Sequence, residues 1–149
     1  DCKQCHGLTD PTEIRWTMTS NKDYNGNGGT REGISAEVSG LNEVLFSALQ
    51  AYAVEVSKVG IVYSAEVYPY FFKDTNNNGK ADADETVFAN AYKAWTPRLL
   101  KAAYNYHYVV KDPGAYVHNA KYVLQVLYDS LEDLSTRVTS LDITKMNRP

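Results

Sequence analysis

Three residues near the start of the chain have the types and the spacing needed to attach a haem. Cys2, Cys5 and His6 form the sequence C-x-x-C-H. In this pattern two thiols add across the vinyl groups of a porphyrin, and the adjacent histidine binds the iron. The motif predicts one covalent haem c, attached through Cys2 and Cys5 and ligated by His6.

Other chemistries of paired cysteines fit this chain less well. A zinc site needs four ligands, and the spacing of His107 and His118 does not fit a zinc finger or knuckle. A disulfide between Cys2 and Cys5 would close a loop too short to stabilise much. A thioredoxin-type pair belongs to a βαβ unit, and the sequence shows none.

The second axial position of the iron decides between electron transfer and catalysis. His118 is the preferred ligand because it directly precedes the predicted last helix; the other candidates are His107, Met18 and Met146. For His107, a hydrogen-bonded histidine near the core is an equally good interpretation. A filled position predicts electron transfer. An open position predicts a haem enzyme, such as a peroxidase or nitrogen-oxide reductase, with His107 or a tyrosine as proton donor. A structural subunit of a cytochrome assembly or filament is the third hypothesis.

A twelve-residue segment over 74–85 fits the calcium-binding loop of an EF-hand. Side-chain oxygens fall at positions 1, 3, 5, 9 and 12, glycine at position 6, and a main-chain carbonyl at position 7: Asp74, Asn76, Asn78, Asp82, Glu85, Gly79 and Lys80. The flanking residues do not resemble paired EF-hand helices. The segment therefore predicts one isolated calcium site that holds irregular chain against the helices; the alternative is a plain Asn-rich turn.

A second segment resembles this loop more weakly, and its register is open. It contains Asp23, Asn25 and Asn27. Counting from Asp23 puts Ile34 at position 12, whereas counting from Asn21 puts Glu32 there. A second calcium ion is therefore possible, with Asp23, Asn25, Asn27 and Glu32 as ligands.

Hydrophobic periodicity predicts a mainly α fold with long irregular loops. Apolar residues recur at helical spacing over residues 32–59, before Gly60. Residues 60–72 favour short extended segments. Helical stretches are predicted from about residue 85 to 96, from Pro97, with Thr96 as cap, to about 110, and from Asn119 onward, ending in a frayed C-terminus. The sequence Asp112-Pro113-Gly114 predicts a turn. We expect one domain over 1–149, with the haem-attachment segment and a loop over 1–31 and the helical part over 32–149.

Composition and charge exclude several classes of protein. The chain has 15 Lys and Arg against 18 Asp and Glu, so it lacks the strong positive charge that is typical of a protein that binds nucleic acid. No apolar run reaches the roughly 20 residues that a membrane span needs. The first residues do not form a signal peptide, so we expect one that has been removed or a piece of a longer protein. Export to the periplasm or beyond is predicted because haem c is attached outside the cytoplasm.

The chain resembles the C-terminal part of long periplasmic or extracellular multihaem c-type cytochromes of bacteria. The matching segments are YPYFFKDTNNNGKADADE (68–85), AYKAWTPRLLKAAYNYHYVVKDPGAYVHNAKYVLQVLYDSL (91–131) and the Arg148-Pro149 ending. The resemblance implies that His118, in the segment DPGAYVHN, ligates a haem. This chain departs from the family in having one C-x-x-C-H motif instead of several. The resemblance therefore implies haem-bearing partner chains or domains, whose haems His118 and His107 could serve.

Overall fold

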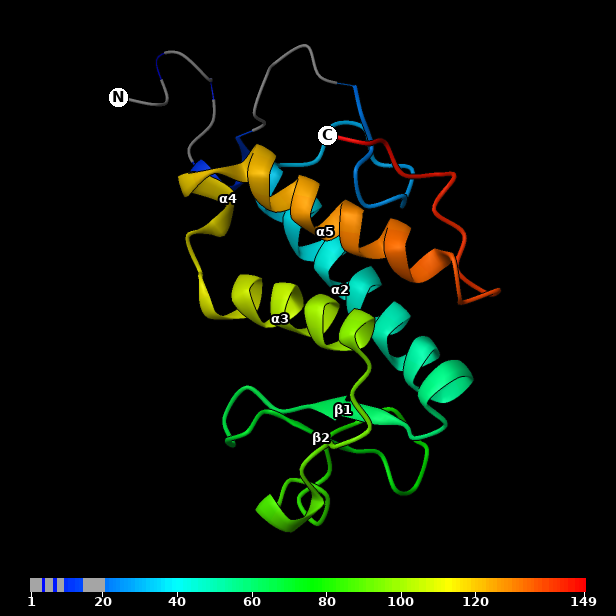
Figure 1. Cartoon of the computed structure of the whole chain (residues 1–149). Helices are drawn as coiled ribbons and strands as arrows, with labels where there is room; N and C mark the ends of the chain where they lie inside the picture. Colours follow the sequence, from blue (N-terminus) through cyan, green and yellow to red (C-terminus); the bar gives the residue numbers. More distant parts are fainter. Residues whose placement is uncertain (1–3, 5–6, 8–9, 15–20) are drawn as a thin grey trace.

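The computed structural model describes residues 4, 7, 10–14 and 21–149, and its framework is three helices beside a two-stranded sheet (Figure 1). The helices are α2 (Ile34–Tyr52), α3 (Pro97–Lys111) and α5 (Ala120–Ser135). The strands β1 (Ile61–Tyr63) and β2 (Phe71–Lys73) form an antiparallel pair. The mainly α fold with short extended segments is confirmed.

Helix α2 is the central element because its apolar side chains recur every three or four residues. Leu41, Leu45 and Leu49 are fully buried, and α2 packs against both α3 and α5. The helix continues into a π-helical segment, η2 (Ala53–Ser57), and ends at Lys58, which has a left-handed backbone with φ 60°. The helix predicted over residues 32–59 is confirmed from Ile34 to Ser57.

The other two long helices begin at the predicted residues, each with a side-chain cap. Thr96 Oγ1 accepts a hydrogen bond from Leu99 N at 3.1 Å, and Pro97 fills the first turn of α3. Asn119 Oδ1 accepts from Tyr122 N at 3.3 Å at the start of α5. These caps satisfy main-chain N–H groups that have no partner within the helix.

Replacing Thr96 with alanine should lower the free energy of unfolding by about 1 kcal/mol, the usual cost of losing a cap. Thr96 Oγ1 also donates to the hydroxyl of Tyr52 at 3.2 Å. Thr96→Ser keeps both hydrogen bonds and serves as the control. Urea denaturation measures the difference, and equal midpoints for the alanine and serine variants would contradict a capping role.

The predicted helix between residues 85 and 96 is wrong. This segment holds only the 3-10 turn η3 (Phe88–Asn90), followed by an isolated bridge between Ala91 and Phe72. Tyr92 N donates to Phe71 O at 3.0 Å, so the main chain pairs with β2 instead of coiling. Pairing with the sheet outweighs a helical preference that is weak in so short a segment.

Between α3 and α5 the chain turns at Asp112–Gly114, as predicted, and then forms the short helix α4 (Ala115–His118), which the sequence did not predict. A second short element, the 3-10 turn η1 (Pro11–Glu13), lies in the segment expected to be loop. Both α4 and η1 pack against α2. In Figure 1 they lie together at the end of the molecule opposite the strands.

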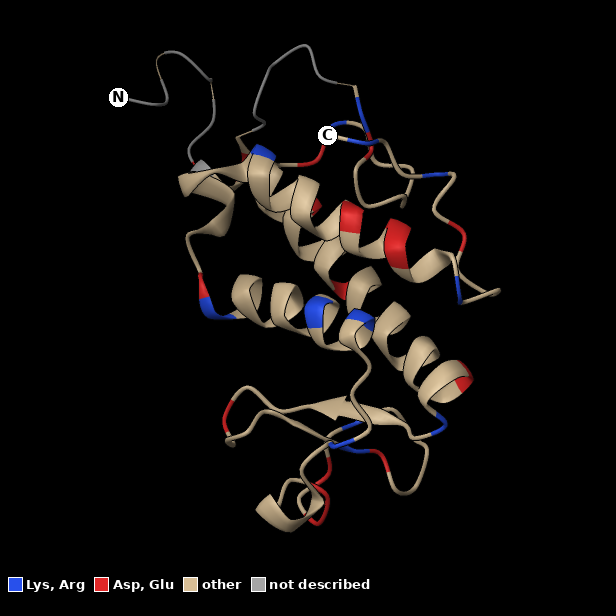
Figure 2. Ribbon diagram, viewed as in Figure 1, with Lys and Arg blue, Asp and Glu red and all other residues tan. Residues whose placement is uncertain are grey.

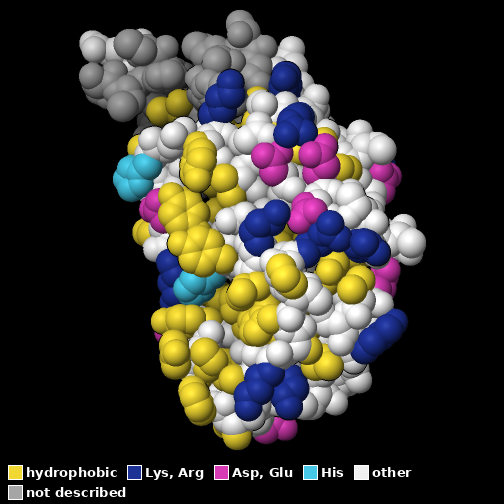
Figure 3. All heavy atoms as spheres, viewed as in Figure 1, with side chains coloured by type: hydrophobic (Ala, Val, Ile, Leu, Met, Phe, Trp, Pro, Cys, Tyr) yellow, Lys and Arg dark blue, Asp and Glu magenta, His cyan; other side chains and the backbone are white. Residues whose placement is uncertain are grey.

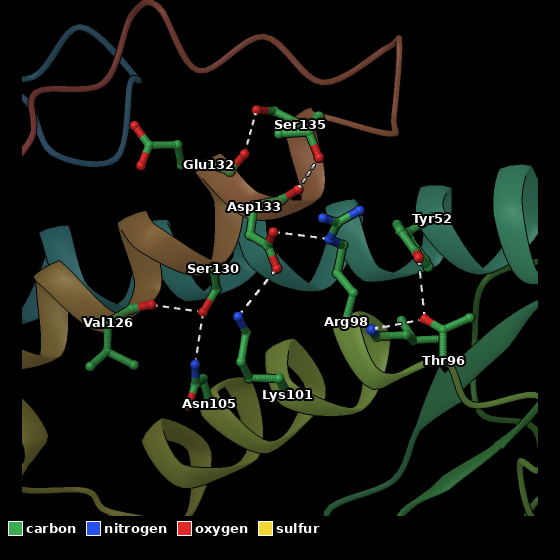
Figure 4. Close-up of polar contacts among 12 residues, drawn as sticks. Tyr52, Thr96, Arg98, Lys101, Asn105, Val126, Ser130, Glu132, Asp133 and Ser135 are labelled. Carbon is green, nitrogen blue, oxygen red and sulfur yellow. Dashed lines mark hydrogen bonds and ion pairs between the residues drawn. The ribbon is translucent and has the colours of Figure 1, made fainter.

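A polar seam joins α3 to α5 (Figure 4). Asp133 receives a hydrogen bond from Arg98 Nε at 2.9 Å and an ion pair from Lys101 at 3.3 Å. Nearby, Asn105 Nδ2 donates to Ser130 Oγ at 2.9 Å. These polar groups add directional contacts to the apolar packing between the two helices.

The C-terminal tail docks on the molecule instead of fraying. Asn147 N and Nδ2 both donate to Asp23 O, at 2.8 and 3.0 Å. Arg148 pairs with Asp129 and Glu132 of α5, and Met146 packs against the core. The frayed end that the polar sequence predicted is therefore wrong.

Charged residues are spread over helices and loops, with acidic segments (red) on the loops beside the strands (Figure 2). Among the described residues, no helix has the length and apolarity required to cross a membrane.

Candidate functional site

The haem-attachment residues Cys2, Cys5 and His6 lie outside the described residues, as does Met18. Beside them only Gln4 and Gly7 are described singly, and the first continuous described stretch is Asp10–Ile14. Its position is fixed because Ile14 O accepts a hydrogen bond from Ile34 N at 3.0 Å, at the first residue of α2. A Cβ atom on Gly33 would lie 2.2 Å from Thr12 O, so only glycine allows this close approach.

His118 ends helix α4 and exposes 72% of its side chain. Its Nδ1 lies 3.4 Å from Asp112 Oδ2. A carboxylate can only accept a hydrogen bond, so this contact favours a proton on Nδ1 and leaves the Nε2 lone pair available. The ring lies over Gly114, where a Cβ atom would come within 2.6 Å of it. Asp112 and Gly114 therefore position an imidazole that is open to solvent.

His107 lies on α3 inside an aromatic cluster. Its Nδ1 is 2.9 Å from the hydroxyl of Tyr63, and its ring packs against Tyr70 and Phe71. Burial, and then the positive charge of Lys111, lower the pKa of His107 below its ordinary value. His107 is therefore a largely neutral histidine packed among aromatic rings.

The pKa of Tyr63, the hydrogen-bond partner of His107, is also shifted. Burial, followed by the nearby Tyr70 and Glu66, raises the pKa of Tyr63 to about 12, so its hydroxyl is protonated at neutral pH. Since a phenol both donates and accepts, it does not fix the tautomer of His107 in the way that Asp112 fixes that of His118. A cavity of about 250 Å³ lies beside the ring, lined among others by Trp95 and Tyr104.

Both histidines (cyan) lie along a band of hydrophobic side chains (yellow) on the face shown in Figure 3. The exposed large hydrophobic residues include Tyr68, Phe88, Leu100, Tyr104, Tyr108, Val117 and Tyr122. Tyrosine combines an apolar ring with a polar tip, so such a surface suits contact with another macromolecule or a cofactor. The remaining candidate ligand, Met146, is packed near Gly26, where a Cβ atom would be 3.0 Å from its side chain.

The loop over 74–85 has the hydrogen bonds of a tight turn around its first residue. Asp74 Oδ1 accepts from Asn78 N at 3.1 Å and Oδ2 accepts from Gly79 N at 2.8 Å. Gly79 has φ 74°, which explains the glycine at position 6. Asn76 Nδ2 and Asn78 Nδ2 donate to Asp82 Oδ2 at 2.9 and 2.7 Å. These side-chain hydrogen bonds lower the pKa of Asp82.

Glu85, the last residue of the loop, is buried and binds the first residues of the loop through hydrogen bonds. It is 1% exposed, and its Oε1 accepts from Thr75 N, Thr75 Oγ1 and Asn76 N at 2.6, 2.7 and 3.2 Å. Burial alone would raise the pKa of Glu85, but the hydrogen bonds from Thr75 and Asn76 bring it below its ordinary value. Glu85 is therefore a buried carboxylate at neutral pH.

The Asp23 loop repeats the hydrogen-bond pattern of the 74–85 loop. Asp23 Oδ1 accepts from Gly26 N at 2.6 Å and Oδ2 from Gly28 N at 2.7 Å, so Asp23 corresponds to Asp74. The amides of Asn25 and Asn27 donate to Glu32 at 3.1 and 2.9 Å, as Asn76 and Asn78 donate to Asp82. Glu32 thus takes the place of Asp82 in the hydrogen-bond pattern, although it is the tenth residue counted from Asp23 and Asp82 is the ninth counted from Asp74.

The position of Glu85 is taken in the Asp23 loop by Glu37, a residue that sequence reasoning missed. Glu37 lies in the first turn of α2, and its Oε2 accepts from Tyr24 N and Asn25 N at 2.9 and 3.2 Å. It lies beyond any twelve-residue window from Asp23, so a loop pattern does not find it. One signal was present: Glu37 is an acidic residue on the apolar face that contains Ile34 and Leu41.

Among the described residues, no group of three or more His, Cys, Asp and Glu side chains gathers as a ready metal cage. The oxygens that either loop offers to a cation include asparagine amide oxygens, which a group made only of His, Cys, Asp and Glu does not include.

Two further residues that sequence reasoning missed support the 74–85 loop. Gln50 Nε2 donates to Gly79 O at 2.8 Å, and Asn90 Nδ2 donates to Lys73 O and Glu85 O, both at 2.9 Å.

Comparison with known proteins connects the chain to polyhaem cytochromes. It is 33% identical over 123 residues to the C-type polyheme cytochrome OmcC of Geobacter sulfurreducens (strain ATCC 51573 / DSM 12127 / PCA), a match that covers 77% of this chain and 15% of OmcC. It is 32% identical, also over 123 residues, to the C-type polyheme cytochrome OmcB of strain DL-1 / KN400, covering 77% of this chain and 16% of OmcB. No family model and no solved structure matches the chain.

The chain thus spans less than a fifth of the length of these relatives. The resemblance to multihaem cytochromes is confirmed for the matched region, while its place at their C-terminal end stays a prediction. The chain is related to a region of the polyhaem c-type cytochromes OmcC and OmcB.

Proposed function

We propose that this chain transfers electrons through one covalently bound haem c, as part of a multihaem cytochrome or of an assembly of haem-bearing chains. The similarity to polyhaem c-type cytochromes over 77% of the chain carries this proposal. The C-x-x-C-H sequence at Cys2, Cys5 and His6 supports it independently. A haem iron bound on both faces exchanges electrons and leaves no position for a substrate.

In this proposal Cys2 and Cys5 bind the porphyrin edge and His6 is the first axial ligand. Three residues lie between His6 and Asp10, so the four steps along the chain span at most about 14 Å when fully extended. Asp10 begins the segment that is anchored at the start of α2. The haem would therefore lie near the end of the molecule that carries η1 and α4.

The second axial ligand in this proposal is His118. Three observations support it over His107. His118 belongs to α4, which packs on α2 at the same end as η1, whereas His107 packs against the strands. Its side chain is exposed, so that binding requires no unpacking. Asp112 accepts from Nδ1, as carboxylates do behind metal-bound histidines, and leaves Nε2 for the iron.

Replacing His118 with alanine tests this assignment. The unaltered holoprotein should show a six-coordinate, low-spin haem, and His118→Ala should become high-spin and bind carbon monoxide or cyanide readily. Optical and resonance Raman spectra measure the change. His107→Ala is the matched control, because it removes an imidazole of the same chain and should leave the spectrum low-spin.

Three outcomes would contradict the assignment. If His107→Ala turns high-spin and His118→Ala does not, His107 is the ligand. If the spectrum of neither variant changes, a methionine or a residue of a partner chain occupies the second axial position of the iron. An unaltered protein that is already high-spin and binds carbon monoxide would favour a haem enzyme over an electron carrier.

The proposal also places the protein outside the cytoplasm and gives it haem-bearing partners. Haem c is attached after export, so a periplasmic or extracellular location follows from the covalent attachment. The band of exposed hydrophobic residues around His107 and His118 supports contact with another haem-bearing chain or domain.

A further inference from the structure

We propose that residues 74–85 bind one calcium ion, with Glu85 as the ligand that closes the site. Oε2 of Glu85 carries this inference, because this oxygen is buried and has no hydrogen-bond partner in the described part of the chain. The other oxygen, Oε1, accepts from Thr75 and Asn76, so the carboxylate is turned into the loop. A buried carboxylate oxygen without a partner costs free energy, and a cation in the loop would satisfy it.

The ends of the loop are already held together, as a calcium site requires. The first and last ligands must approach each other from opposite ends of the twelve residues. The amide of Asn90 joins these ends, because it donates to Lys73 O, just before the loop, and to Glu85 O, its last residue. Gln50 of α2 binds the middle of the loop at Gly79 O. Little ordering of the main chain would be needed when the ion binds.

The charge of the loop also favours a cation. Asp74, Asp82 and Glu85 place three carboxylates within twelve residues, and hydrogen bonds from main-chain and side-chain amides surround all three. Neutral donors offset such repulsion only in part, whereas a divalent ion would remove it. Asn76 and Asn78 add amide oxygens at positions 3 and 5, and Lys80 adds a main-chain carbonyl at position 7. This set of oxygens gives the six to eight ligands that calcium prefers, while magnesium demands a smaller, strictly octahedral shell.

Calcium binding at this loop does not depend on the haem proposal, and it is tested on the full holoprotein after removal of divalent ions with a chelator. Isothermal titration with calcium chloride should show a tight site, and added calcium should raise the melting temperature. Glu85→Gln should weaken the affinity by about tenfold or more, because it removes a charged ligand. Asp82→Asn should also weaken the affinity for calcium. Because Asp82 is partly exposed, this change leaves buried hydrogen bonds undisturbed.

Asp84→Asn is the matched control, because Asp84 is an exposed acidic residue of the same loop at position 11, which supplies no ligand. The affinity of the Asp84→Asn variant for calcium should stay within about twofold of the affinity of the unaltered protein. The proposal is overturned if calcium and chelator give the same melting temperature. It is also overturned if Asp84→Asn weakens binding as much as Asp82→Asn, since the effect would then be general screening. Unchanged affinity in both Glu85→Gln and Asp82→Asn would assign the ion to the Asp23 loop.

Discussion

A chain in which Cys2 and Cys5 are both alanine is expected to lose all of its haem on denaturation, whereas the unaltered chain keeps one haem. The sequence contains two cysteines, so it can form no more than two thioether bonds to a haem. The unaltered protein should therefore carry the added mass of one haem through unfolding and chromatography. Intact-mass spectrometry under denaturing conditions measures the difference.

The single variants Cys2→Ala and Cys5→Ala each keep one thiol and should retain haem less completely. His118→Ala provides the matched control for haem loading, because it should change the spectrum and leave the covalent mass intact. Complete loss of haem from the unaltered protein on denaturation would show that the attachment is not covalent. That result would also remove the main reason for placing the protein outside the cytoplasm.

Replacing Glu37 with alanine is expected to lower the free energy of unfolding by several kcal/mol. Glu37 is fully buried, and its carboxylate accepts hydrogen bonds from Tyr24 N and Asn25 N, which are also buried. Each buried N–H group left without a partner costs about 1–3 kcal/mol. The midpoint of urea denaturation, compared at constant slope, measures the loss.

Two variants separate this effect from a simple change of charge. Glu37→Gln keeps an oxygen that can accept one of the hydrogen bonds, so its effect should be smaller. Glu43→Ala removes an exposed glutamate from the same helix and should change the stability by no more than about 0.5 kcal/mol. Equal effects of Glu37→Ala and Glu43→Ala would show that the loop does not depend on Glu37.

Periodicity and turn chemistry predicted the parts of the fold that depend on local sequence. Leucines at helical spacing predicted α2 and α5, and the Thr96-Pro97 pair predicted the start of α3. The 74–85 loop could be located because its oxygens and its glycine follow a fixed spacing within twelve residues. In each case the residues that determine the structure are neighbours in the sequence.

The features that the sequence did not predict depend on partners far along the chain. Residues 91–92 pair with β2, and no local pattern indicates that this contact replaces a helix. The role of Glu37 arises from loop residues twelve and thirteen positions before it, with an insertion that breaks the EF-hand count. His118 could be selected from its place beside a predicted helix, but its contact with Asp112 and its position over Gly114 required the structure.

The contact between Asn147 and Asp23 bears on the order in which the molecule folds. It joins residues 124 positions apart, so the chain loses much conformational freedom when it forms. Helices build from local contacts and assemble sooner than such a distant pair. We therefore expect the tail to dock on an already assembled bundle and, in the folded protein, to open before the helices do. Such an opening would uncover the loop that begins at Asp23 while α2, α3 and α5 stay packed.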